Sequence, residues 1–129
     1  MELQLDNHSS GHRVRSFNGN TAVIGDVRYT ASLIVTPKQV VSDWPPQHPN
    51  QLTIDDFGVI LALEPELILV GTGNILCFPD SVILKGIIRA GIGIDFMDSH
   101  AVCRTYNILA AEGRHVAAGI IIDRSTSTT

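Results

Sequence analysis

The segment DSHAVCRTYNILAAEGRHVAA, residues 98–118, combines chemically active side chains with the spacing of a helix. His100 and Cys103 are three positions apart, so they could touch on one helix face. A cysteine near a helix N-terminus has its thiolate form favoured, and the pair could therefore supply a nucleophile. However, no third group stands at a recognisable spacing, and lone cysteines more often pack as small apolar side chains. We therefore name no catalytic residue and favour a protein that is not an enzyme.

Polar and glycine residues follow two predicted strands, over 66–71 and 92–97. The carboxyl ends of parallel strands share one edge of a sheet, where open α/β sheets bind ligands. An anion could be attracted by free N–H groups at a glycine turn and at the start of a helix capped by Ser99. The Arg104 guanidinium could add to this attraction, because helical side chains lean toward the helix N-terminus. The predicted site would hold a small anionic ligand or a carboxylate of a partner, and it consists of Gly71, Thr72, Gly73, Asp98, Ser99, Arg104 and Asn107.

Simpler structural roles compete with this site. Arg104 could instead form an ion pair with Asp98 or Asp95 and only fix the helix. The GTG sequence at 71–73 could serve a tight turn between strand and helix. A dinucleotide fingerprint would need a third glycine where this chain has Leu76, and the Gly-Lys-Ser/Thr ending of a Walker loop is absent. We therefore expect no cofactor.

Cysteine usage is sparse. Cys77 and Cys103 are far apart and form neither a CxxC pair nor a Cys/His zinc pattern, so the sequence indicates no metal site and no disulfide framework. Two lone cysteines in an acidic chain favour a reducing compartment.

The second half of the chain alternates strands and helices. Thr53 is expected to cap a helix that Pro65 stops, because a hydroxyl can accept a hydrogen bond from the first helical turn and proline cannot continue a helix. Right-handed crossovers then imply a mostly parallel sheet. The predicted elements after that helix are a strand at 66–71, a helix at 80–91, a strand at 92–97, a helix at 99–113 and a strand at 115–122.

The first third of the chain is predicted to be extended. Residues 12–36 indicate two or three antiparallel strands, which would form a small separate element or extend one edge of the main sheet. The segment 42–50 contains three prolines and must be a loop. Trp44 in this loop either covers the core or makes an exposed contact, and we expect it to cover the core. The expected domain organisation is a flexible N-terminus over 1–11, a single α/β domain over 12–123 and a disordered tail over 124–129.

Composition narrows the possible partners. The chain has 129 residues and a net charge of -4, which argues against general binding of nucleic acid despite a local group of basic residues near the start. No apolar run approaches the roughly 18 residues needed to cross a bilayer, and the N-terminus lacks the apolar region of a signal peptide. We therefore expect no membrane span, and the cytoplasm is the default location.

The sequences ELILVGTG, the helix after Pro79 and MDSHAVCRTYNILAAEGRHVAA resemble a small α/β domain of unknown function. That family is shared by archaeal and bacterial proteins and by mitochondrial complex I assembly factor 3. The resemblance covers roughly residues 25–122. Ser99 stands where the family often has threonine, which preserves the hydroxyl, and His100 is less typical. The positions that fit the family's C-terminal motif are Met97, Asp98, Ala101, Cys103, Arg104, Thr105, Tyr106, Asn107, Leu109, Glu112, Gly113 and Arg114.

The resemblance implies a three-layer β+β/α fold with a mixed central sheet. The mitochondrial relative is an assembly factor that acts through protein contacts, with no established catalysis, and a bacterial relative need not share that role. We therefore expect a non-catalytic interaction or assembly-factor-like module whose partner is a protein such as a respiratory-complex subunit. The alternative is a binder of, or enzyme on, a small anionic metabolite at the edge formed by Gly71–Gly73 and Ser99–Arg104.

Overall fold

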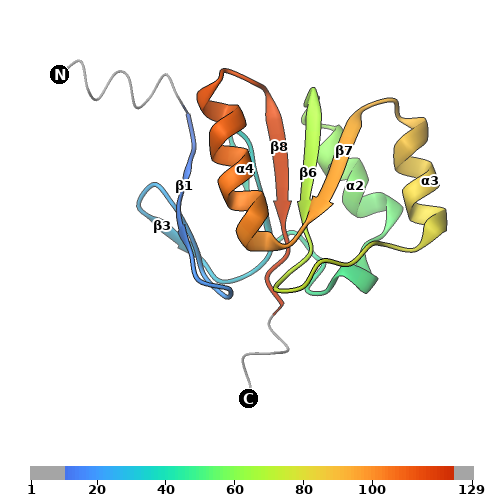
Figure 1. Ribbon diagram of the computed structural model, residues 1–129, viewed down its shortest axis with the longest axis horizontal. Coiled ribbons are helices and arrows are strands. Elements are labelled where there is room, and N and C mark those ends of the chain that lie inside the picture. Colours follow the sequence, from blue (N-terminus) through green and yellow to red (C-terminus); the bar gives the residue numbers. More distant parts are fainter. Residues whose placement is uncertain (1–10, 124–129) are drawn as a thin grey trace.

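The structure is a computed structural model that describes residues 11–123 (Figure 1). The predicted disordered tail, and all of the predicted flexible N-terminus except Gly11, lie outside the described residues. The described elements are β1 (Val14–Phe17), β2 (Ala22–Ile24), β3 (Val27–Tyr29), β4 (Leu33–Val35), β5 (Val40–Val41), the 3-10 turn η1 (Pro49–Gln51), α2 (Ile54–Leu61), β6 (Leu67–Gly71), α3 (Ser81–Arg89), β7 (Gly93–Met97), α4 (Ser99–Ala111) and β8 (Val116–Ile120).

Five strands form a mixed central sheet in the order β5-β4-β8-β6-β7. β6 is parallel to β7 and to β8, with Leu67 in register with Gly93 on one side and Val116 on the other. β4 is antiparallel to β8 and to the short strand β5. A second, antiparallel sheet contains β1, β2 and β3. The predicted α/β class with a mixed central sheet and a small antiparallel N-terminal element is confirmed, and β4 also extends the central sheet as expected.

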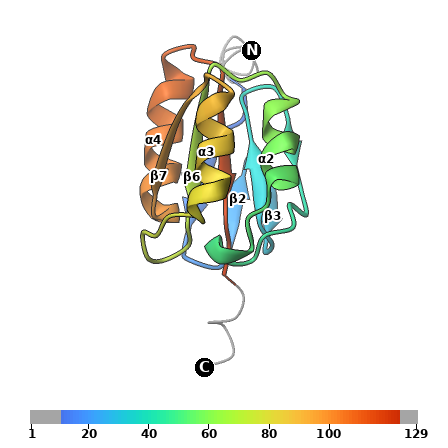
Figure 2. The ribbon, with the colours of Figure 1, turned by 90° about the vertical axis from the view of Figure 1, so that its right-hand side faces the viewer.

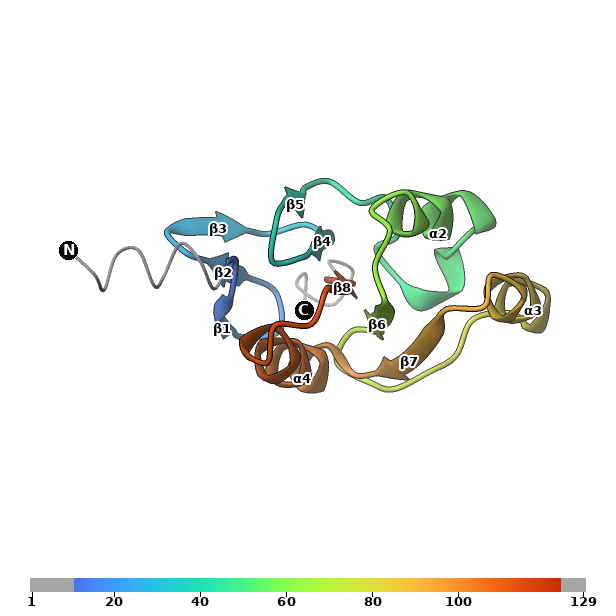
Figure 3. The ribbon, with the colours of Figure 1, turned by 90° about the horizontal axis from the view of Figure 1, so that it is seen from above.

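The central sheet has a core on each face, because strands buried on both sides send alternate side chains to opposite layers. One core lies beneath α4 and the small sheet, and it includes Val116, Ala118 and Ile120 of β8. The other lies beneath α2 and α3 and includes Ala117 of the same strand. Figure 3 shows α4 and β1 on one side of the central strands and α2 on the other, and Figure 2 shows α2 and α3 next to each other. The result is the three-layer arrangement that the family resemblance implied.

Trp44 covers the core on the α2 side, as predicted. Its side chain is 2% exposed, and its indole Nε1 donates a hydrogen bond to the Asp56 carbonyl oxygen at 3.1 Å. The ring lies against Gly119 of β8, where an added Cβ would come within 2.7 Å of an indole carbon. Gly119 is therefore required by the close approach of the tryptophan to the sheet.

The helix α2 begins as the sequence predicts but ends earlier. Thr53 Oγ1 accepts from the Asp56 N–H at 3.1 Å, and Asp56 Oδ2 accepts from the Thr53 N–H at 3.0 Å, which together form a capping box. The helix ends at Leu61 rather than continuing to Pro65. The residues between them form a tight turn in which Glu64 has a φ of 55°. This left-handed residue, rather than the proline, redirects the chain into β6.

The two later helices are also slightly shorter than predicted. Predicted helix 80–91 is observed as Ser81–Arg89, with Asp80 as its N-cap, and predicted helix 99–113 as Ser99–Ala111. The left-handed Gly91 and Gly113 follow their ends, with φ of 76° and 82°. None of the helices within residues 11–123 is long and apolar enough to span a bilayer.

Candidate functional site

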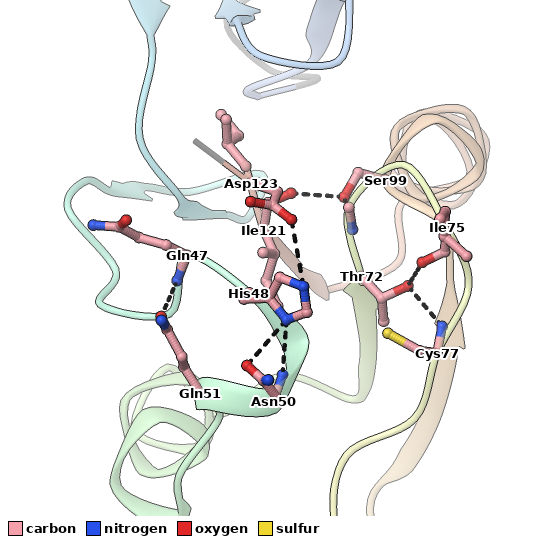
Figure 4. Close-up of polar contacts among 12 residues, drawn as sticks. Gln47, His48, Asn50, Gln51, Thr72, Ile75, Cys77, Ser99, Ile121 and Asp123 are labelled. Atoms are coloured by element: carbon pink, nitrogen blue, oxygen red, sulfur yellow. Dashed lines mark hydrogen bonds and ion pairs between the residues drawn. The ribbon is translucent and has the colours of Figure 1, made fainter. Parts of the chain in front are cut away.

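The segment Gly71–Gly73 starts at the last residue of β6, and we call it the glycine turn. It lies against the start of α4, as the sequence predicts. The Gly73 N–H donates to Ser99 Oγ at 2.9 Å, and the Ser99 N–H donates to the Gly73 carbonyl oxygen at 2.7 Å. The Ser99 hydroxyl then donates to the Ile121 carbonyl oxygen, just after β8, at 2.9 Å. Figure 4 shows this serine between the chain segments that follow β6 and β8. One buried hydroxyl thus ties together the ends of all three parallel strands.

Ser99 is not the helix cap that the sequence indicated. Asp98 holds that position, and its carboxylate accepts from the Ala101 N–H at 2.9 Å. Ser99 is the first residue of α4 and is 0% exposed, because its hydroxyl is turned inward to the strand ends. The contact explains Gly71 as well, since a Cβ there would lie 2.8 Å from Ser99 Oγ. The prediction of the Ser99 cap was therefore wrong, and Gly71 is required by its contact with Ser99 and not by a tight turn into the next helix, which starts only at Ser81.

Several of the backbone donors that we expected an anion to use are already bonded within the protein. Both N–H groups of the Gly73–Ser99 pair are occupied. The neighbouring Thr72 is 3% exposed; its N–H donates to the Met97 carbonyl oxygen, and its hydroxyl donates to that of Ile75 at 2.8 Å. Its hydroxyl oxygen also accepts from the Cys77 N–H at 3.2 Å. The glycine turn is consequently a structural joint that shapes the loop leading to α3.

Arg104 and Asn107 lie on a different surface of α4. Asn107 bonds the backbone of β1 in both directions: its Oδ1 accepts from the Val14 N–H at 2.9 Å, and its Nδ2 donates to the Val14 carbonyl oxygen at 2.8 Å. Arg104 is exposed, and within residues 11–123 its side chain makes no hydrogen bond or ion pair. The alternative in which it pairs with Asp98 or Asp95 is thus not realised in the described chain.

The Cys103 thiol is unsuited to nucleophilic chemistry. It is buried beneath α4, and this burial raises its pKa to about 12, so the neutral thiol persists far above physiological pH. The His100 ring packs edge-on against Phe17, with ring centroids 4.8 Å apart.

A second group of side chains at the same end of the sheet was missed from the sequence. A cavity of about 190 Å³ is lined by His48 before η1, Cys77 in the loop after β6, and Asp123 after β8, among others. His48 Nε2 lies 3.5 Å from Asp123 Oδ2, and its Nδ1 lies 3.0 Å from Asn50 Oδ1. Figure 4 shows these side chains around the cavity, which we call the Cys77 cavity. Asp123 could have been found, because it follows the last predicted strand at the ligand-binding edge; His48 lies in a proline-rich loop without any spacing signal.

Metal chemistry has no obvious donor set here. Within residues 11–123, no three histidine, cysteine, aspartate or glutamate side chains are grouped so that they could hold a metal ion. The Cys77 cavity instead has a mostly hydrocarbon wall with one histidine–aspartate pair at its rim.

Beyond the glycine turn, the chain exposes an apolar surface. Phe78 and Val82 are 62% and 69% exposed, although the Phe78 ring also contacts the Phe96 ring edge-on with centroids 5.7 Å apart. The adjacent β7 is the end strand of the central sheet, so one of its edges is unpaired in the described chain. We call the exposed side chains of this segment the apolar rim: Ile75, Leu76, Phe78, Val82 and Ile88.

Comparison with known proteins assigns the chain to a family. The family described as "Protein of unknown function (DUF498/DUF598)" matches residues 14–121, from the first residue of β1 to the residue after β8. The chain belongs to this family. The match includes both sheets, α4 and the glycine turn.

The named relatives of this DUF498 protein include a bacterial and a mammalian protein. The chain is 46% identical over 63 residues to the "13 kDa major membrane protein" of Francisella tularensis, which covers 49% of this chain and 51% of that protein. It is 30% identical over 110 residues to NADH dehydrogenase (ubiquinone) 1 alpha subcomplex assembly factor 3 of Rattus norvegicus. This match covers 84% of this chain and 59% of that protein. The chain therefore spans between about half and three fifths of these relatives' lengths. The predicted resemblance to the assembly factor family is confirmed.

A solved structure agrees with the fold. A Xanthomonas campestris protein determined by NMR matches with a TM-score of 0.78 at 36% identity, over 87% of this chain and 85% of that chain. The similarity covers the three-layer arrangement described above. It supports the architecture.

Proposed function

We propose that this DUF498 domain is a non-catalytic protein-interaction module with an assembly-factor-like role. The observation that carries the proposal is the apolar rim. Of the nine large hydrophobic side chains that are exposed within residues 11–123, five lie between positions 75 and 88. Exposed apolar side chains that are concentrated in one segment are candidates for a contact with another protein.

Hydrogen bonds at the glycine turn fix the start of the loop that carries the apolar rim. Because Ser99 and Gly73 bond each other at the base of the loop, the exposed Phe78 and the start of α3 leave the sheet from a defined point. An interface built on a pre-organised loop avoids part of the entropic cost of ordering it upon binding. The apolar rim therefore favours a role in binding a partner protein over a role in catalysis.

The partner that we propose is a subunit of a respiratory complex, met on the cytoplasmic side of the membrane. The name of the rat relative supports this choice, since that protein is called an assembly factor for an NADH dehydrogenase subcomplex. A subunit awaiting assembly exposes apolar surface that will later be buried, and such surface would be complementary to the rim.

The test is complementation of a deletion strain of the native host. Assembled NADH dehydrogenase would be measured on native gels, and proteins crosslinked to the domain would be identified by mass spectrometry. The double variant Phe78→Ser/Val82→Ser should lower assembled complex and lose the crosslinked subunit. Ile108→Ser is the matched control, because Ile108 is also exposed, at 60%, but lies on α4.

The proposal fails if the rim variant restores the complex as well as the wild-type domain does. It also fails if the rim and Ile108 variants lose the crosslink equally, since the apolar rim would then have no special role. The melting temperature of each purified variant is measured as well, so that a loss of the crosslink is compared only between variants that are equally folded.

A further inference from the structure

A cavity between β1 and α4 carries positive charge only. It has a volume of about 200 Å³, and its charged or titratable lining side chains are Arg15, His100, Cys103 and Arg104. No aspartate or glutamate lines it, although the whole chain carries a net charge of -4. We call this space the β1–α4 cavity. It is smaller than a typical cofactor pocket, so it suits a compact group and not a whole nucleotide.

The polar side chains of this cavity have unused hydrogen-bonding capacity. The Arg104 guanidinium has five N–H donors and bonds to none of the described residues. The ring nitrogens of His100 likewise make no hydrogen bond within residues 11–123. Arg15 is partly engaged, since its Nη1 lies 3.5 Å from Asp26 Oδ1 and donates to the Gly25 carbonyl oxygen at 3.3 Å. Both members of that ion pair are well exposed, so an anion could compete for the arginine.

The two walls of the cavity are fixed relative to each other. Asn107 bonds both backbone groups of Val14, and the Tyr106 hydroxyl donates to the His12 carbonyl oxygen at 2.7 Å. Arg15, next along β1, is therefore held opposite α4. One N–H of the Asn107 amide remains after its bond to Val14 and is available to a ligand.

We propose that the β1–α4 cavity binds a phosphate group, either free or as the ester of a small metabolite. Arg104 would bind two phosphate oxygens through its planar fork, Arg15 would add a second positive charge, and the Asn107 amide would donate to a third oxygen. This site keeps Arg104 and Asn107 of the predicted anion site and replaces the glycine turn with β1. It is independent of the proposed interaction at the apolar rim, which lies in the segment that leads from β6 into α3.

The test is a titration of the full-length, isotope-labelled protein with inorganic phosphate and, separately, glycerol phosphate at constant ionic strength. NMR shifts should concentrate at Ser16, His100 and the Asn107 side-chain amide. Arg104→Ala should weaken the affinity by about tenfold or more, as expected for loss of one charged hydrogen-bonded partner. Arg89→Ala is the matched control, since Arg89 is an exposed arginine at the end of α3. The two titrants distinguish a free phosphate ion from a phosphate ester as the preferred ligand.

The inference is overturned if Arg104→Ala leaves the affinity unchanged or if both arginine variants weaken it equally. It is also overturned if chloride at the same ionic strength produces the same shifts, because the effect would then be general screening. Arg104 is exposed, so its replacement should not unfold the domain, and the melting temperature of each variant checks this directly.

Discussion

Ser99 and Gly73 exchange two hydrogen bonds, one through a side chain and one through the backbone, at the point where α4 starts and β6 has ended. This pair joins segments 26 positions apart in sequence. The serine hydroxyl also reaches Ile121, so the joint includes the last strand. The Ser99 side chain therefore fixes the start of α4 relative to the ends of β6 and β8.

Replacement of Ser99 by alanine should destabilise the domain by about 1–3 kcal/mol, because a buried N–H and a buried carbonyl would lose their partner. Urea unfolding followed by circular dichroism measures this change. Ser81→Ala is the control, since Ser81 begins α3 and is exposed. Equal stability of the two variants would contradict the role assigned to the Ser99 hydroxyl.

Gly119→Ala should cost about 1–3 kcal/mol of unfolding free energy, because its methyl group would push against the buried Trp44 ring. The tryptophan fluorescence should also shift if the indole moves away from the sheet. Gly58→Ala provides the comparison: Gly58 is in α2, and beyond the neighbouring backbone of that helix no atom lies within 4 Å of an added Cβ. That variant should be neutral or slightly more stable, since alanine favours helices. A destabilised Gly58 variant beside an unaffected Gly119 variant would refute the packing argument.

The two cysteines should differ strongly in reactivity. Cys77 lines an open cavity, whereas Cys103 is buried with a pKa raised to about 12 by desolvation. Iodoacetamide at pH 8 should therefore alkylate Cys77 in the native protein and reach Cys103 only after denaturation. Peptide mass spectrometry at increasing times distinguishes the two sites. Modification of Cys103 first would show that the helix above it opens more readily than the loop after β6.

Stability should fall in alkaline solution. Burial raises the folded-state pKa values of both Cys103 and Tyr106, so an unfolded chain releases these protons at lower pH than the folded one does. The stabilisation is complete below the thiol pKa of an unfolded chain, near 8.5, and is lost progressively as pH rises toward about 12. Melting temperatures from pH 7 to 11 measure the slope, and Cys103→Ala should make it shallower. An identical slope in that variant would exclude the thiol as a contributor.

The sequence was sufficient for features that depend on local chemistry or on strand order. Thr53 and Asp56 are three positions apart, so the start of α2 could be predicted from side-chain reach alone. The meeting of the glycine turn with the start of α4 followed from the rule that parallel strands end at one edge. Both predictions needed only neighbours in sequence or the alternation of strands and helices.

Other features depend on distant partners and could not be predicted in this way. Asp98 and Ser99 are both good helix caps, and the choice between them depends on the bond from Ser99 to Ile121, 22 positions away. His48 meets Asp123 only because a proline-rich loop folds across the end of β8. Asn107 resembled a ligand-binding residue, yet its amide mainly holds β1. The sequence does not state which polar side chain satisfies which backbone group.

The small sheet is attached to the rest of the molecule without sharing a strand ladder. Within the described chain, β1 pairs only with β2, while the hydroxyl of Tyr106 and the amide of Asn107 fasten it to α4. Detachment of the small sheet would leave every central strand with its neighbours, but it would expose the core beneath α4 to which Val14, Ala22 and Ile24 contribute. The small sheet of β1, β2 and β3 would then act as a cover over α4, and the β1–α4 cavity would exist only while that cover is in place.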